Sequence, residues 1–209
     1  MPLYVLAFTD TPLEPWTVGR HRLQAVAVNG LCAICERRDT APSASEEELR
    51  EQHALVLAVA ARVTAILPVR FGALLGRREL VALIRSHEAE IRQGLEIVRD
   101  RVQMTLRVVG TRRAPRAVQA SSGREYLERR LRATSPSLPP PARAVLAALQ
   151  PMVVRERREP GVGSLLATVY HLIDAGDVAR YTRVVKNCSN RRMILTGPWP
   201  PFAFTPQLW

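Results

Sequence analysis

Two cysteines in the stretch "LCAICE", Cys32 and Cys35, have the C-x-x-C spacing that serves redox catalysis or metal binding in many proteins. In thioredoxin-like sites such a pair begins a helix, and the helix dipole lowers the thiol pKa. The residues around this pair are β-prone, however, and side chains three apart in a strand point to opposite faces. We therefore interpret both cysteines as small buried side chains and expect neither metal binding nor catalysis from them.

The four histidines show neither H-x-x-x-H nor H-E-x-x-H spacing, so they indicate no metal site. His53 falls on the apolar stripe of a predicted helix and His171 in an apolar strand, which favours packing roles for both. Carboxylates cluster only at residues 46–48, where they complement the dipole of a helix N-terminus. Nucleophile elbows and phosphate-binding glycine loops are also absent from the sequence. The sequence therefore predicts a protein that is not an enzyme and needs no cofactor.

The formal net charge of +11 raises the possibility of an acidic partner, although only Lys186 among the 30 basic residues is a lysine. Such a preference for arginine over lysine is more typical of a compositional bias of the genome than of a surface that binds phosphate groups. Residues 101–150 hold ten arginines and two carboxylates, so most of the excess charge lies there. We expect this stretch, with Arg112, Arg113 and Arg116, to make a salt-sensitive contact with an acidic partner. The alternative function is an arginine-rich nucleic-acid-binding module, although the predicted strands lack paired aromatic residues for stacking bases.

The composition is that of an ordinary globular protein, with 47% hydrophobic and 23% charged residues among 209. The first residues, "MPLYVLAFTDTP", lack the basic region of a secretory signal. The most apolar stretch, residues 54–69, contains Arg62 and is shorter than the ~18 residues that suggest a membrane span. We expect a soluble, cytoplasmic protein that does not bind a membrane.

Strand signals dominate the beginning of the chain. Residues 2–10 predict a strand, and residues 23–35 contain two β-prone runs joined by Asn29-Gly30, the favoured two-residue turn of a hairpin.

Two helices are predicted to follow. The first begins after Ser45, which forms a capping box with Glu48, and continues until Pro68 ends it. The second spans residues 77–98. The apolar stripe of the first helix includes Leu49, His53, Val56, Leu57, Ala60, Val63 and Leu67.

From residue 101 onward the predicted order is strand, helices, strand, strand, helix, strand. One of these helices covers "GREYLERRLR", and the last strand should stop near Gly197 because prolines follow it. The order βαββαβ is typical of a ferredoxin-like fold. The sequence thus predicts the α+β class with two domains, a mixed α+β unit over residues 1–100 and a ferredoxin-like domain over residues 101–209 that ends in a proline- and aromatic-rich tail. The four predicted strands of one antiparallel sheet are residues 102–109, 152–157, 165–173 and 192–196.

Two stretches have no catalytic group but an unusual composition, "LPVRFG" at residues 67–72 and "TGPWPPFAF" at residues 196–204. Proline fixes φ and stiffens the chain, so we expect Trp199 to pack firmly against the C-terminal sheet or the domain junction. Phe202, Phe204 and Trp209 are then freer to contact a partner. The candidate structural or partner-binding residues are Pro68, Arg70, Phe71, Gly72, Gly197, Pro198, Trp199, Pro200, Pro201, Phe202 and Phe204.

With these motifs the chain resembles the gas vesicle protein F/L family over nearly its whole length. The resemblance is carried by the hairpin at Asn29-Gly30, by His53 on a helix that precedes the "LPVRFG" stretch, and by three later segments. These segments are "GREYLERR" at 123–130, "LLATVYHLID" at 165–174 and "LTGPWPPF" at 195–202. Family members usually end this last motif in proline-tyrosine-serine-phenylalanine, where this chain has Pro201-Phe202-Ala203-Phe204.

The resemblance implies an accessory or structural protein of gas vesicle formation, located in the cytoplasm and at the gas vesicle. Its expected partners are the small hydrophobic shell protein and other gas vesicle accessory proteins. Shell subunits expose apolar surface before assembly, and such surface aggregates unless it is covered. The aromatic, proline-rich tail is the expected docking strip.

Overall fold

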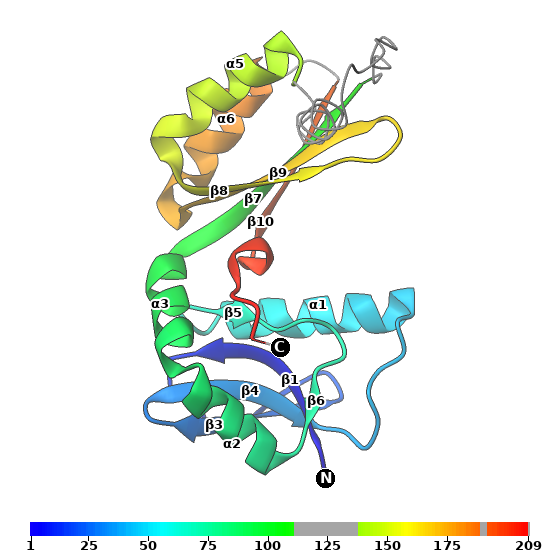
Figure 1. Ribbon diagram of the computed structural model, residues 1–209, viewed down its shortest axis with the longest axis vertical. Coiled ribbons are helices and arrows are strands. Elements are labelled where there is room, and N and C mark those ends of the chain that lie inside the picture. Colours follow the sequence, from blue (N-terminus) through cyan, green and yellow to red (C-terminus); the bar gives the residue numbers. More distant parts are fainter. Residues whose placement is uncertain (111–137, 189–191, 209) are drawn as a thin grey trace, which may run out of the picture. The chain divides into compact units, whose positions relative to one another are not determined.

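The computed structural model describes residues 1–110, 138–188 and 192–208 (Figure 1). The helix predicted over "GREYLERRLR", the residues Arg112, Arg113 and Arg116, and Trp209 lie outside the described residues. The chain forms two compact units, the first made of Met1–Gln103 with Trp199–Trp209 and the second of Met104–Pro198. Compact units do not by themselves show independent folding, so a domain boundary near Asp100 stays a prediction.

The first unit contains a six-stranded antiparallel sheet with the order β2-β3-β4-β1-β5, and β6 also pairs with β1. All seven residues of β1 are buried, which explains why its sequence is mostly apolar and does not alternate between apolar and polar residues. The strands are β1 (Leu3–Thr9), β2 (Trp16–Val18), β3 (His21–Val28), β4 (Leu31–Arg37), β5 (Leu67–Pro68) and β6 (Leu74–Leu75).

The predicted hairpin is confirmed. Val28 pairs with Leu31, and the two turn residues Asn29 and Gly30 have φ values of 52° and 79°. Positive φ at both positions is what the two-residue turn of a twisted hairpin requires. The amide of Asn29 also donates to the Glu88 carboxylate at 2.7 Å, which ties the turn to a helix.

The first predicted helix is present but shorter than expected. Helix α1 (Glu46–Ala60) begins with the backbone N–H of Glu48 donating to Ser45 Oγ at 3.2 Å, so Ser45 is the N-cap. The carboxylate of Glu48 pairs with Arg38 at 3.0 Å. The prediction that the helix continues to Pro68 was wrong, because Leu67 and Pro68 enter the sheet as β5, opposite Phe8 and Ala7 of β1.

The second predicted helix is two helices, α2 (Arg77–Ser86) and α3 (Glu88–Val98). His87 separates them, since its φ of −114° and ψ of 20° leave the helical region. The break lets each helix direct its own apolar residues into the core. Leu80, Ile84, Ile91 and Leu95 are all buried.

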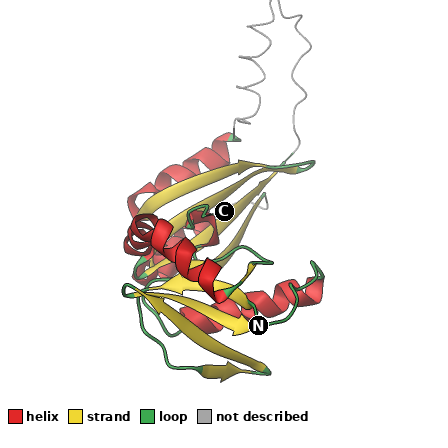
Figure 2. Ribbon diagram, turned by 60° about the horizontal axis from the view of Figure 1, so that its bottom comes forward, coloured by secondary structure: helices red, strands yellow, loops and turns green. Residues whose placement is uncertain are grey.

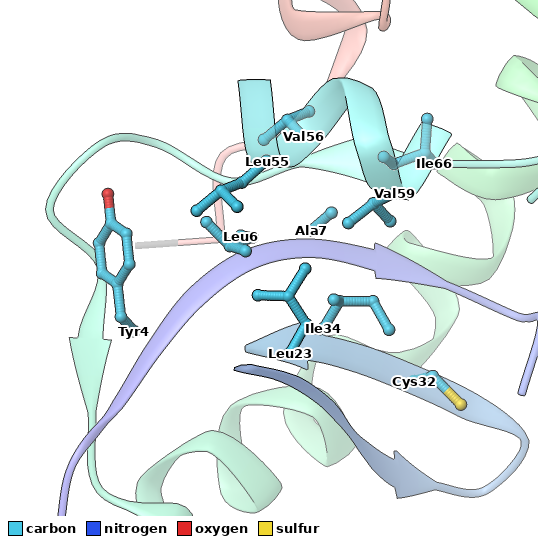
Figure 3. Packing of buried hydrophobic residues seen from close by; sticks show 10 residues of the cluster. All are labelled: Tyr4, Leu6, Ala7, Leu23, Cys32, Ile34, Leu55, Val56, Val59 and Ile66. Atoms are coloured by element: carbon cyan, nitrogen blue, oxygen red, sulfur yellow. The ribbon is translucent and has the colours of Figure 1, made fainter. Parts of the chain in front are cut away.

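The core of the first unit lies between α1 and the sheet. Leu55, Val56 and Val59 of the helix pack over Leu6, Leu23 and Ile34 of three neighbouring strands (Figure 3). Helix α2 lies on the other side of the sheet from α1 (Figure 1).

The second unit is built on a four-stranded sheet with the order β10-β7-β9-β8. Its strands are β7 (Arg101–Val109), β8 (Val153–Pro160), β9 (Leu165–Asp174) and β10 (Met193–Trp199), which confirms that the four predicted segments share one sheet. Helices α5 (Pro140–Leu149) and α6 (Val178–Cys188) contact one another and lie on one face of it (Figures 1 and 2). The described residues thus have the α+β class, with two antiparallel sheets and five α-helices.

The last strand is longer than predicted. β10 does not stop near Gly197 but continues through Pro198 to Trp199. It is the end strand of its sheet, and an end strand tolerates proline because its outer side makes no ladder hydrogen bonds. Among the described helices, none is both long and apolar enough to cross a membrane.

Candidate functional site

The C-terminal tail packs on helix α1 of the first unit. The ring of His53 meets Trp199 edge-on at 5.2 Å between centroids and stacks on Phe202 at 5.8 Å. Trp199 was expected to pack against the C-terminal sheet or the domain junction; it ends β10, and its ring contacts His53 of α1. His53 is therefore a packing histidine, as predicted, but its contacts are with the tail.

Further contacts fix the course of the tail. Pro200 and Pro201 are buried, and the 3-10 turn Phe202–Phe204 contacts β5. The backbone N–H of Ala203 donates to Gln103 Oε1 at 2.7 Å. Near Gly94 of α3 the packing is tight, since a Cβ there would lie 2.9 Å from Leu67 Cδ1 and 3.4 Å from Pro206 Cδ. A side chain at position 94 would require Leu67 to shift, whereas glycine fits this contact as it is.

One flank of α1 continues the apolar surface of the tail. Leu49 and Leu57 are 47% and 38% exposed, and with His53 they follow the i, i+4, i+8 spacing of one helix side. Phe202, stacked on His53, is 38% exposed. We call Leu49, His53, Leu57, Trp199 and Phe202 the α1–tail strip. The predicted stripe was wrong for Leu49 and Leu57, because the buried face of α1 consists of Gln52, Leu55, Val56 and Val59.

The "LPVRFG" stretch is held by buried polar groups. The Tyr4 hydroxyl donates to Gln52 Oε1, and Gln52 Nε2 donates to the Val69 carbonyl at 3.2 Å. The Gly72 N–H lies 3.5 Å from the same hydroxyl. Burial raises the pKa of Tyr4, so its hydroxyl stays protonated and remains a donor. This Tyr4–Gln52 network fixes the path of the chain from β5 into the following loop.

The second half of that stretch lines an apolar hollow of about 350 Å³. The structure thus separates the predicted site residues. Pro68 belongs to β5, which the tail contacts, whereas Arg70, Phe71 and Gly72 line the hollow. Its other lining residues are Ala73, Leu74, Leu75 and Leu83.

The two cysteines lie in β4, and both are buried. Cys32 belongs to the cluster beneath α1, whereas Cys35 points to the opposite face and contacts the Gln24 carbonyl at 3.6 Å. Burial raises the pKa of both thiols, that of Cys35 to about 11, which keeps them protonated and unreactive at neutral pH. No group of three or more potential metal ligands occurs within the described parts of the chain.

The second unit contains a buried polar cluster that was not predicted from the sequence. His171 is fully buried, with Nδ1 2.7 Å from the Tyr181 hydroxyl and Nε2 2.9 Å from Glu156 Oε2. Burial lowers the pKa of His171, which favours the neutral ring. Glu156 and His171 are direct cross-strand partners of β8 and β9. Strand pairing was the one signal that could have indicated this contact.

The comparison with known families gives a match over residues 2–206, to the family described as gas vesicle synthesis protein GvpL/GvpF. The chain belongs to this family. It is a family of gas vesicle synthesis and not a family of known enzymes. No curated protein matches the sequence significantly.

Two solved structures of gas vesicle proteins share the fold of this GvpL/GvpF family member. The crystal structure of GvpF from Anabaena sp. PCC7120 has a TM-score of 0.74 at 14% identity, covering 99% of this chain and 98% of that one. That of GvpF from Microcystis aeruginosa has a TM-score of 0.73 at 12% identity, covering 99% of both chains. At these identities the likeness concerns the fold alone.

Proposed function

We propose that this protein acts in gas vesicle synthesis by binding the small hydrophobic shell protein during assembly, through the α1–tail strip. Membership in the GvpL/GvpF family supports the part of this proposal that concerns gas vesicle synthesis. The observation that carries the binding surface is the exposed Phe202, which is stacked on His53 between the exposed Leu49 and Leu57 of one helix flank.

Physical chemistry supports this surface as a docking site. An apolar strip on a protein surface gains free energy when an apolar partner covers it. The tail enters this strip through Pro200 and Pro201, both buried, and its 3-10 turn is held by the Ala203–Gln103 hydrogen bond. A partner therefore meets a surface that is already ordered, which lowers the entropic cost of binding.

The proposal also covers the identity of the two domains, the location of the protein and its other partners. The sheet order β10-β7-β9-β8 supports a ferredoxin-like second domain, and the first domain is the α+β unit of residues 1–100. We propose a non-catalytic role in the cytoplasm and at the gas vesicle, in contact with other accessory proteins. Arg70, Phe71 and Gly72 contribute to the apolar hollow described above.

The test compares two double variants for retention of purified shell protein on the immobilised full-length chain. Leu57→Ala with Phe202→Ala removes two exposed members of the strip. Val162→Ala with Ile194→Ala removes exposed apolar groups elsewhere, since these are 87% and 49% exposed. We expect the strip variant to lose about tenfold in affinity, equivalent to ~1.4 kcal/mol, and the control to lose less than about twofold.

Equal retention by both variants would refute the strip as the docking surface. Melting temperatures of both variants check that a loss of retention is not a loss of folding. A filter-binding titration with salt tests the alternative function, because tight nucleic-acid binding with a steep salt slope would favour it.

A further inference from the structure

A second hollow of the first unit, about 330 Å³ in volume, is lined mainly by arginine. It lies where β3 and β4 run side by side, next to the short strand β2. Three guanidinium groups and one carboxylate face a space large enough for a small molecule. The lining residues are Pro15, Arg20, Arg22, Gln24, Glu36 and Arg37.

The carboxylate in this hollow is already engaged. Glu36 lies 2.9 Å from His21 Nδ1 and 3.0 Å from Arg38 Nε. Arg20 is also paired, with Glu51 at 2.6 Å. The hollow therefore contains no spare negative charge for its remaining arginines.

Arg22 and Arg37 are the arginines without a carboxylate. Both are exposed, and neither has an ion-pair partner among the described residues. The register pairs Leu23 with Glu36, so Arg22 and Arg37 stand one position further along the two adjacent strands. Like charges placed opposite one another destabilise a sheet, so this pair needs a compensating gain.

The positive field extends beyond the hollow itself. Arg37 and Arg77 both lower the pKa of the Cys35 thiol against the larger rise that burial causes. Arg77, at the start of α2, thus lies near enough to act on the same face of the sheet.

We infer that this hollow is an oxyanion site that binds a small ligand through its phosphate or carboxylate groups, with Arg22 and Arg37 as the principal ligand-binding residues. A guanidinium group donates two parallel hydrogen bonds to a carboxylate or phosphate, and two such groups side by side fit a ligand with several anionic oxygens. The Gln24 amide adds a polar group to the same wall. This inference is independent of the proposed function, because the hollow and the α1–tail strip have no residue in common.

The test is titration calorimetry of the full-length protein at low salt, with pyrophosphate and citrate as separate probes. The site variant is Arg22→Gln with Arg37→Gln. The control is Arg85→Gln with Arg143→Gln, two exposed arginines elsewhere, which removes the same net charge. We expect the site variant to lose at least about tenfold in affinity and the control less than about twofold. Binding of pyrophosphate alone would identify a phosphate ligand, and binding of citrate alone a carboxylate ligand.

Two further measurements check that a loss of affinity comes neither from misfolding nor from the loss of charge alone. Because the paired arginines repel one another, the site variant should melt at the same temperature as the wild type or higher when no anion is present. Arg37→Lys, which keeps the charge and loses the planar fork, should also weaken binding. The inference is overturned if neither probe binds the wild type, or if the site variant and the control lose affinity equally.

Discussion

Each of the two units buries a tyrosine whose hydroxyl meets a polar group from another element, but the polar groups differ in chemistry. In the first unit Tyr4 is 1% exposed and donates to the amide of Gln52 on α1. In the second unit Tyr181 of α6 is fully buried beside His171 of β9, which also meets Glu156. Both arrangements satisfy a hydroxyl that would be costly to bury alone.

The difference lies in what pH does to each arrangement. An amide such as Gln52 stays neutral at every accessible pH, so the Tyr4–Gln52 network takes up no proton near neutrality. His171 and Glu156 are titratable, and their pKa values are shifted in the folded protein. We infer that acidification weakens the second cluster while it leaves the first hydrogen-bond network intact.

The largest effect should come from removing either ring entirely. Tyr4→Ala and Tyr181→Ala each leave a large cavity in a closed core, which typically costs ~3–5 kcal/mol of unfolding free energy. Urea unfolding at neutral pH measures both losses. Tyr170→Ala is the control, since this partly exposed tyrosine should cost clearly less. A small loss at only one of the two buried sites would show that the units do not depend equally on their tyrosines.

A smaller effect is expected from removing the Tyr4 hydroxyl alone. Tyr4→Phe leaves Gln52 Oε1 without its donor inside the core, at a cost of ~1–3 kcal/mol. Because burial raises the pKa of the Tyr4 hydroxyl above its ordinary value of 10.0, the group that is lost does not titrate between pH 5.5 and pH 8, and the cost should be the same at both. Denaturant unfolding at both values tests this. A cost that changed with pH would mean that the first network, too, is linked to protonation.

The third prediction concerns the pH dependence itself. Burial lowers the pKa of His171 from its ordinary value of 6.5, so the unfolded chain binds a proton there more readily than the folded one. The contribution of His171 to stability is therefore complete above pH 6.5 and declines as the pH falls below it towards the folded pKa. Burial acts to raise the pKa of Glu156, but hydrogen bonds from Arg158 and His171 lower it overall, so its contribution is lost only below about pH 4.5.

Melting temperatures from pH 8 to pH 5 measure this dependence. His171→Gln keeps the hydrogen-bonding capacity of the ring and cannot titrate, so it should flatten the decline below pH 6.5. An unaltered decline in the His171 variant would assign the pH dependence to other groups.

Local signals explain why some elements could be predicted from the sequence. The turn at Asn29-Gly30 and the N-cap Ser45 depend on neighbours within a few residues, and both are confirmed. The end of α1 was missed because the apolar residues up to Leu67 fit helical spacing equally well. The burial of Leu67 in β5 comes from pairing with Phe8 of β1, about sixty residues earlier in the chain, which local patterns do not encode.

The contacts of the candidate site, too, could not be predicted from local sequence patterns. The proline-braced tail was recognised from its composition, but its contact with His53 joins residues far apart in the sequence. Leu49 and Leu57 share a helix flank with His53, so spacing placed them together correctly. Spacing alone could not say whether that flank is buried, because the sheet covers only the face centred on Val56 and Val59.

The smallest effect tests the helix that brings Gln52 to Tyr4. Ser45 Oγ accepts the Glu48 N–H at the start of α1, and replacing such a cap by alanine typically costs ~1 kcal/mol. Seven residues of helix, ~10 Å of rise, separate this cap from Gln52. Ser45→Ala and Tyr4→Phe should therefore be additive to within ~0.5 kcal/mol in the double variant, as is usual for sites without shared partners. Urea unfolding of both single variants and the double variant measures this, with Ser43→Ala as the exposed control. A coupling larger than ~0.5 kcal/mol would mean that fraying at the first turn reaches Gln52, and that the Tyr4–Gln52 network depends on the cap as well as on burial.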